Sequence, residues 1–241
     1  MKYAIKKLWV ACVCVSLSSM ALANGFYVGA GVGAIGMKNK LSSTSTTTNS
    51  EQGTTNVYEN NDFNTDVAVN SALFMGYALF FPNKYVLSLE AFANASPVSV
   101  NNVVNNSYST IDSSIKFNSV YGVRLLPGFQ VTKSSIVYAI AGYALANAKV
   151  QGTLNGTALD SPRLDSQYDE TRHLNGYQLG LGAMTHVANH VLIRGDLIYS
   201  GYQSTSVTAT SNNGDLSNTY SVKPYTIEAN LSLMYQFGQP S

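Results

Sequence analysis

Cysteine is nearly absent from this sequence, which removes several kinds of chemistry at once. The 241 residues include two cysteines, Cys12 and Cys14, and both lie in an N-terminal stretch that has the features of an export signal. Once that stretch is removed, the exported chain has no thiol for a disulfide, a zinc site or nucleophilic catalysis.

Charge and long apolar runs are scarce as well. Charged residues make up 11% of the chain, whereas they make up about a quarter of a soluble domain. No apolar run reaches the ~20 residues of a membrane-spanning helix, which argues against a helical inner-membrane protein. Tyr, Ser, Thr, Asn and Gly are abundant instead. This composition fits a protein whose outer face meets lipid and whose loops are polar but uncharged.

Residues 1–23 are predicted to be a Sec signal peptide. Three lysines precede an apolar run over residues 8–15, and Ala21-Leu22-Ala23 forms a small-x-small cleavage pattern. Cleavage is expected between Ala23 and Asn24, which leaves residues 24–241 as one domain. Without the three lysines, 11 of the 14 basic residues remain against 13 acidic ones. No basic patch for nucleic acid is therefore expected.

Eight segments of roughly ten residues or more alternate apolar and polar side chains, which is typical of transmembrane β-strands. They cover residues 25–37, 67–81, 85–95, 115–130, 135–148, 173–187, 191–202 and 223–237. Short connections at 82–84, 131–134 and 188–190 alternate with long ones at 38–66, 96–114, 149–172 and 203–222. This pattern predicts an all-β fold, an eight-stranded antiparallel up-and-down transmembrane β-barrel with periplasmic turns and long surface loops.

The last segment shows the alternation most clearly. Ile227, Leu231 and Leu233 share one face, which is expected to meet lipid, and Glu228 lies on the other face. Tyr225, Tyr235 and Phe237 stand at the ends of the apolar face, where aromatic girdles mark the membrane interfaces. Glycines recur at 29, 31 and 33 and at 176, 180 and 182. They are expected to face inward and to leave room for large side chains of facing strands.

Several motifs resemble those of a known family, the small eight-stranded outer-membrane barrels of the OmpA transmembrane-domain and opacity-protein type. They are Gly25-Phe26-Tyr27-Val28-Gly29-Ala30-Gly31-Val32-Gly33, Leu126-Pro127-Gly128-Phe129 with Ala141-Gly142-Tyr143, Asn175-Gly176-Tyr177-Gln178-Leu179-Gly180-Leu181-Gly182, and Arg194-Gly195-Asp196-Leu197-Ile198-Tyr199-Ser200-Gly201-Tyr202. The resemblance implies the outer membrane of a Gram-negative bacterium. It also implies that Phe237 is the aromatic signal read by the assembly machinery, although four residues follow it.

Two further patterns do not predict a functional site. Gly31-Val32-Gly33-Ala34-Ile35-Gly36 matches a dinucleotide-binding motif, but a Ser/Thr-rich loop follows it where that site needs a helix. His173, His186 and His190 are the three histidines, and some eight-stranded outer-membrane barrels are lipid-modifying enzymes that use histidine. No motif around them supports that chemistry. No catalytic, cofactor or metal site is predicted.

The ionisable residues on predicted inward faces form the main candidate site. They are Glu90, Lys116, Arg124, Arg194, Asp196 and Glu228. An eight-stranded barrel is only wide enough for side chains to fill it, and enclosed charges must pair because an isolated buried charge is very costly. We expect Arg124 and Arg194 to pair with Glu90, Asp196 and Glu228 and to close the lumen.

The predicted function is a structural or adhesin-like role carried out by the surface loops. Expected partners are outer-membrane lipid and lipopolysaccharide, the outer-membrane assembly machinery, and host surfaces or neighbouring outer-membrane proteins. Two alternatives from other classes remain open, a narrow or gated channel for ions and small solutes and a lipid-modifying enzyme. A soluble periplasmic β-sandwich is the alternative fold.

Overall fold

The computed structural model describes residues 25–48, 53–58, 65–106, 109–156, 164–210 and 216–237. These residues form ten β-strands: β1 Phe26–Thr48, β2 Gly53–Tyr58, β3 Thr65–Phe80, β4 Tyr85–Asn106, β5 Ser109–Gln130, β6 Ser135–Gly156, β7 Leu164–Ala188, β8 Val191–Tyr202, β9 Thr205–Thr210 and β10 Leu216–Gln236. Among the residues described, no helix is long and apolar enough to cross a membrane. The predicted cleavage site at Ala23 and Asn24 lies outside the described residues, as do residues 238–241.

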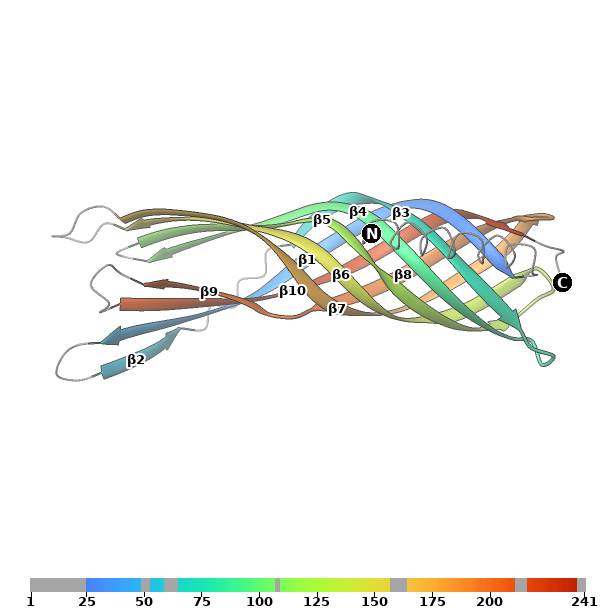
Figure 1. Cartoon of the computed structure of the whole chain (residues 1–241), viewed down its shortest axis with the longest axis horizontal. Helices are drawn as coiled ribbons and strands as arrows, with labels where there is room; N and C mark the ends of the chain where they lie inside the picture. The colour runs from blue at the N-terminus through green and yellow to red at the C-terminus, as the bar shows by residue number, and fades with distance from the viewer. Residues whose placement is uncertain are drawn as a thin grey trace, which may run out of the picture.

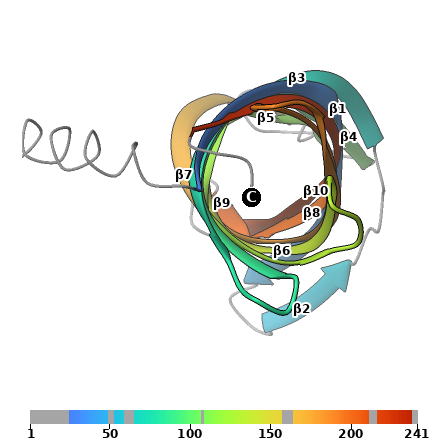
Figure 2. The ribbon, with the colours of Figure 1, turned by 90° about the vertical axis from the view of Figure 1, so that its right-hand side faces the viewer.

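Eight of these strands close into a barrel. In the order β1, β3, β4, β5, β6, β7, β8 and β10 each strand pairs with the next, and β1 pairs with β10 to complete the ring. Figure 2, which looks along the barrel, shows this ring. The seam begins with Tyr27 opposite Gln236, and Phe237 N donates a hydrogen bond to Phe26 O over 2.8 Å. The prediction of an all-β, eight-stranded antiparallel barrel is confirmed.

Three tight turns join strands at one end of the barrel, which lies to the right in Figure 1. They occupy residues 81–84, 131–134 and 189–190, close to the three predicted short connections. Phe81 N donates to Tyr85 O over 2.9 Å in the first turn, and Val131 N donates to Ser135 O over 3.0 Å in the second. The turns therefore keep the backbone groups at the strand ends paired.

The segments predicted as long loops are largely strand, and that part of the prediction is wrong. β1 continues beyond the barrel, where it pairs with β2 on one side and with β10 on the other, and β10 pairs with β9. We call β2-β1-β10-β9 the first outer sheet. The extensions of β4, β5, β6 and β7 pair in the same way and form the second outer sheet. The two groups of hairpins lie to the left in Figure 1.

Continued backbone pairing explains these extensions. Strands that leave the membrane side by side already have partners for their N–H and C=O groups, so pairing can go on without a new element. Threonine and valine, which recur in these segments, also favour extended structure. The apolar–polar alternation that located the eight barrel strands is missing from residues 41–48, LSSTSTTT. Alternation alone therefore could not reveal them.

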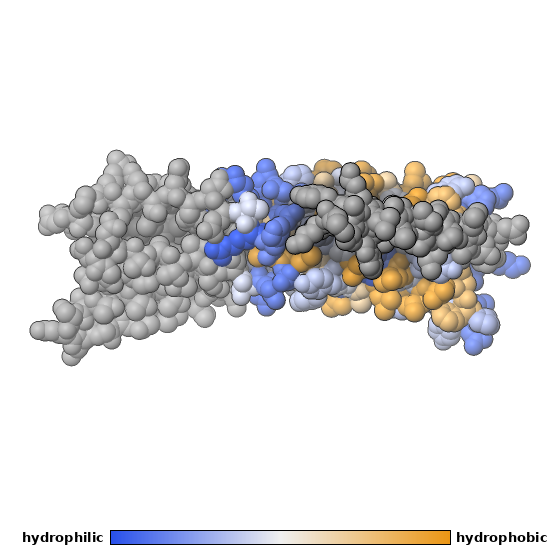
Figure 3. Space-filling view, in the orientation of Figure 1, coloured by the Kyte–Doolittle hydropathy of each residue, from blue (hydrophilic) through white to orange (hydrophobic). Residues whose placement is uncertain are grey.

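The outside of the barrel is apolar in the part next to the short turns. Val69 is 73% exposed and Leu181 is 68% exposed, which suits a wall that faces lipid. Figure 3 shows this apolar belt in orange, with hydrophilic residues in blue at both of its borders. Aromatic rings pair at the two borders, Tyr85 with Phe129 near the short turns and Tyr177 with Tyr199 on the hairpin side.

The inside of the barrel is filled by side chains in three layers. An apolar layer lies on the short-turn side and consists of Ala78, Val86, Leu126, Ile136, Met184, Leu192 and Met234. A second apolar layer lies on the hairpin side and includes Ile35, Met37, Val98, Phe117, Val120, Ala144, Ala146, Ala148 and Leu174. Buried polar and charged side chains fill the middle. The polar middle is thus enclosed between two apolar layers.

Inward-facing glycines make room for large side chains. These side chains belong to adjacent strands, and not to strands on the opposite side of the barrel as predicted. A methyl group on Gly29 would lie 2.3 Å from the ring of Phe74, its cross-strand partner on β3. A methyl group on Gly182 would lie 2.4 Å from both the ring of Tyr138 and the carboxylate of Asp196, which are its partners on β6 and β8. Large inward side chains therefore lean sideways over the glycine of the next strand.

We expect Gly182→Ala to destabilise the barrel and Gly195→Ala to leave its stability unchanged. The first methyl group overlaps Tyr138 and Asp196, whereas nothing lies within 4 Å of the second. Overpacking of this kind costs about 1–3 kcal/mol. Urea unfolding in detergent micelles measures the difference. It is followed by circular dichroism because the one tryptophan, Trp9, lies in the predicted signal peptide. Equal midpoints for the two variants would contradict the packing described here.

Candidate functional site

Five of the six predicted lumen residues are buried in the polar middle of the barrel. They are Glu90 on β4, Arg124 on β5, Arg194 and Asp196 on β8 and Glu228 on β10, and none is more than 8% exposed. Alternate residues of a strand point to the same side, so residues at similar depth on neighbouring strands meet in the lumen. Glu90 and Arg124 are direct cross-strand partners.

Lys116 lies on the outer face, and its predicted place in the lumen is wrong. Its side chain is exposed, while the neighbouring Phe117 is fully buried and points inward. The prediction assumed unbroken alternation back from Arg124, but the register of β5 against β6 shifts between Phe117 and Ser119. One extra residue in a strand turns every side chain on its far side to the opposite face. Counted back from Arg124, Lys116 lies beyond this extra residue.

Proline supplied a signal for this irregularity. The register of β4 against β5 also shifts, between Ala95 and Val98, and Pro97 stands inside that shift. Proline cannot donate a ladder hydrogen bond, so within a sheet it is confined to edges and bulges. A bulge near residue 97 was therefore readable from the sequence, although its effect on Lys116 in the next strand was not.

Glu90 is the carboxylate that both arginines share. Arg194 Nη1 donates to Glu90 Oε2 in a short contact, and Arg194 Nη2 lies 3.4 Å from Oε1. Arg124 Nη1 lies 3.6 Å from Glu90 Oε1. Arg194 also reaches Asp196, with 2.8 Å between Nε and Oδ2. Among the described residues, removing Arg194 would therefore leave Asp196 without an ion pair, and removing Glu90 would leave Arg124 without one.

Glu228 differs from the expected arrangement because amides, and not an arginine, bind it. Asn70 Nδ2 and Asn94 Nδ2 donate to Glu228 Oε2 over 3.3 and 3.2 Å. Among the described residues no guanidinium lies within ion-pair distance of its carboxylate. The prediction from the sequence concerned ionisable residues alone. It did not include these asparagines because their side chains are neutral.

Neutral side chains complete the charged cluster. Tyr27 OH donates to Glu90 Oε2 over 3.1 Å, and Tyr138 OH donates to Asp196 Oδ1 over 2.6 Å. Arg124 Nε donates to Gln178 Oε1 over 2.8 Å, and the Arg124 guanidinium lies 3.7 Å from the ring centre of Phe92. These contacts hold the charges in place and also fill the lumen. The cluster as a whole is suited to closing the barrel.

The other candidate features are separate from this cluster. His173 Nδ1 lies 2.6 Å from Asn147 Oδ1 on the hairpin side, whereas His186 and His190 lie beside the short turns. In the part of the chain that the structure describes, no group of three or more His, Cys, Asp or Glu side chains could hold a metal ion. The predicted absence of catalysis and cofactors stays a prediction.

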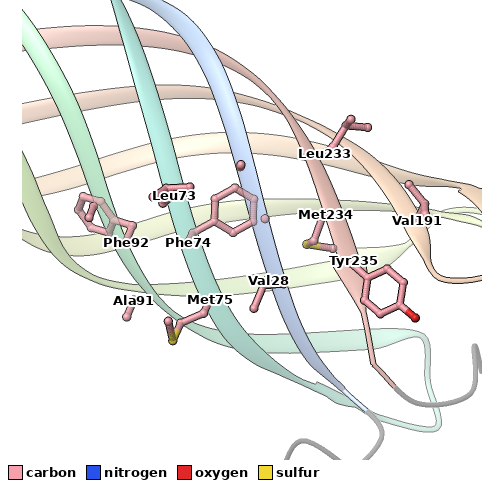
Figure 4. Close-up of a pocket in the computed structure, with 13 residues that line it drawn as sticks. Val28, Leu73, Phe74, Met75, Ala91, Phe92, Val191, Leu233, Met234 and Tyr235 are labelled. Carbon is pink, nitrogen blue, oxygen red and sulfur yellow. The ribbon is translucent and has the colours of Figure 1, made fainter.

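An apolar groove of about 760 Å³ lies on the outside of the wall, over β10, β1, β3 and β4. Figure 4 shows its lining, which includes Val28, Leu73, Met75, Ala91 and Leu233. The groove belongs to the lipid-facing belt, and its lining includes no charged residue.

Arg194→Ala is expected to destabilise the barrel strongly, because it leaves the carboxylates of Glu90 and Asp196 without their shared partner. Breaking a buried ion pair costs about 3–5 kcal/mol. Lys116→Ala is the matched control, since this exposed side chain is outside the cluster and should change stability by less than about 0.5 kcal/mol. Urea unfolding in micelles measures both, and a midpoint for Arg194→Ala equal to that of the unmodified protein would disprove the structural role.

Comparison with solved structures gives distant likenesses. Neisserial surface protein A is 14% identical with a TM-score of 0.42, over 88% of this chain and 97% of that chain. The attachment invasion locus protein Ail of Yersinia pestis is 13% identical with a TM-score of 0.35, over 82% and 98%. The outer membrane protease OmpT of Escherichia coli is 10% identical with a TM-score of 0.45, over 88% and 97%.

No curated protein matches the sequence. The model of the outer membrane protein beta-barrel domain family matches residues 8–237, a span that includes all eight strands of the closed barrel. The chain therefore belongs to the outer membrane protein beta-barrel domain family.

Proposed function

We propose that this outer-membrane barrel is closed to solutes and acts through structural or adhesin-like contacts of its two outer sheets. The observation that supports this most directly is the filled lumen. Glu90 binds both Arg124 and Arg194 in the middle, and apolar layers lie on both sides of them. Opening a path would require separating buried charges, which is costly.

The outer sheets offer surfaces that are suited to contact. In the order of paired strands β2 and β9 stand at the two ends, so each has one edge without a strand partner among the described residues. Free N–H and C=O groups at such an edge can bind an extended segment of another protein. The segments are also rich in Ser, Thr and Asn, whose hydrogen bonds adapt to varied surfaces. Host surfaces and neighbouring outer-membrane proteins are the proposed partners.

Lipopolysaccharide is proposed as the lipid partner on the hairpin side. Lys116 and Lys149 are direct cross-strand partners on the outer face of β5 and β6, and Lys223 lies outward on β10 beyond Tyr225. Lysines near a membrane surface attract anionic groups. The phosphate groups of the outer leaflet would supply such anions. Export through the Sec pathway and recognition of Phe237 by the assembly machinery complete the proposal.

The closed lumen predicts that the folded protein does not conduct. Refolded protein, checked for its compact form by heat-modifiable gel mobility, should give no current steps above background in planar bilayers. Mock-treated detergent micelles provide the baseline. Reproducible steps that disappear when the sample is heat-denatured would support the channel alternative and overturn this part of the proposal.

Shortening a hairpin should remove binding without unfolding the barrel. Because Ser43 lies directly opposite Tyr58, residues 44–57 can be replaced by a two-residue Asn-Gly turn. Gln151 lies opposite Asp169, so residues 152–168 can be replaced in the same way. The two variants test the first and the second outer sheet separately.

Bacteria that display each variant are compared for adhesion to cultured epithelial cells, with surface exposure measured by antibody. We expect at least one variant to lose most of the adhesion that the unmodified protein adds over an empty vector. Unchanged adhesion in both variants, or no adhesion by the unmodified protein, would contradict an adhesin-like role.

A further inference from the structure

The buried charges of the lumen do not balance. Among the described residues three carboxylates, Glu90, Asp196 and Glu228, are buried together with two guanidiniums, Arg124 and Arg194, which gives a formal charge of −1. Glu90 and Asp196 are bound by arginine. Glu228, which is fully buried, is the carboxylate without an ion pair within this set. An uncompensated charge in such surroundings is very unfavourable.

Oxygen atoms without hydrogen-bond partners gather around this same carboxylate. They are Glu228 Oε1, Thr226 Oγ1 and Asn230 Oδ1 on β10, Asn70 Oδ1 on β3 and Asn94 Oδ1 on β4. The side chains are at most 8% exposed. Buried polar atoms in folded proteins nearly always have a partner, so these acceptors are suited to bind a donor or a cation.

Two of these oxygens converge on one place. Asn70 and Asn230 are the cross-strand partners of Gly33 on its two sides. The position that a methyl group on Gly33 would take lies 2.8 Å from Asn70 Oδ1 and 2.1 Å from Asn230 Oδ1. The two oxygens are therefore about 5 Å apart or less, close enough to bind one cation. Two acceptors this close together are stabilised by a donor or a positive charge between them.

The orientation of Asn70 and Asn94 fits a cation as well. Both amide nitrogens are used on Glu228 Oε2, so their carbonyl oxygens are turned away from that atom and remain available. Rotating the Asn70 amide to satisfy Asn230 would remove one of the two donors from Glu228. Water could satisfy the acceptors, but water does not cancel the charge.

We propose that a monovalent metal cation of the sodium class is bound beside Glu228 in the polar middle of the lumen. Its ligands are the free carboxylate oxygen of Glu228 and the amide oxygens of Asn70 and Asn230, with Asn94 and Thr226 as further oxygen donors. Hard cations prefer such oxygen ligands, and a single positive charge makes the buried cluster neutral. The apolar layers on both sides imply that the cation enters while the barrel folds.

The test is to refold the mature protein from urea into micelles in sodium, potassium, calcium or choline chloride at one ionic strength. Constant ionic strength keeps charge screening equal. Sodium should raise the thermal midpoint over choline, by roughly 3–5 °C for each tenfold excess over the dissociation constant. Glu228→Gln should abolish the sodium response, and Asn230→Ala should weaken it. Ser232→Ala, which removes a buried polar side chain of β10 outside the proposed ligand set, should keep it.

The outcomes are distinguishable. Equal midpoints in sodium and choline would overturn the proposal, and they would leave a protonated Glu228 or bound water as the explanation. A sodium response that survives both Glu228→Gln and Asn230→Ala would place the ion elsewhere and overturn it too. A calcium response that exceeds the sodium response would contradict a monovalent ion. Protein refolded with thallium(I) can also be crystallised. An anomalous scattering peak between residues 70 and 230 would support the proposed cation site directly.

Discussion

The pairing of β1 with β10 is the constraint on which the rest of this structure depends. A lipid environment offers no partner for backbone N–H and C=O groups, so a sheet that crosses it must close on itself. Closure with eight strands sets the width of the barrel, and that width leaves room for side chains but not for an open passage. The enclosed side chains must then satisfy one another, which explains why Glu90 is shared by two arginines.

Packing inside the barrel follows from the same narrowness. Long side chains such as Tyr138 and Phe74 cannot all extend across the axis, and each leans over a glycine of the adjacent strand. The glycines are therefore part of the interior packing and not merely flexible positions. The polar middle and the two apolar layers also have different roles. The middle holds a specific set of hydrogen bonds and ion pairs, and the layers keep water from competing with them.

The strand number, the short turns and the inward position of five charged residues could be predicted from the sequence, because a period of two leaves a clear trace wherever one face is apolar. The outward position of Lys116 could not be predicted. A bulge near Phe117 turns the preceding residues of β5 to the opposite face, and the sequence of β5 itself gives no sign of this bulge. The contacts of Asn70 and Asn94 with Glu228 could not be predicted either. The depth of these residues in the barrel depends on the register between strands that are distant in sequence. The outer sheets were not predicted because their segments, such as residues 41–48, lack the regular apolar–polar alternation of the barrel strands.

The two outer sheets have one more consequence, for how this protein can change over generations. Their strands are held by backbone hydrogen bonds between neighbours, and such bonds make few demands on side chains. Insertions, deletions and substitutions at the hairpin ends therefore leave the interlocked lumen untouched. The hairpin ends can therefore vary from one generation to the next while the barrel that enters the membrane keeps the same interior.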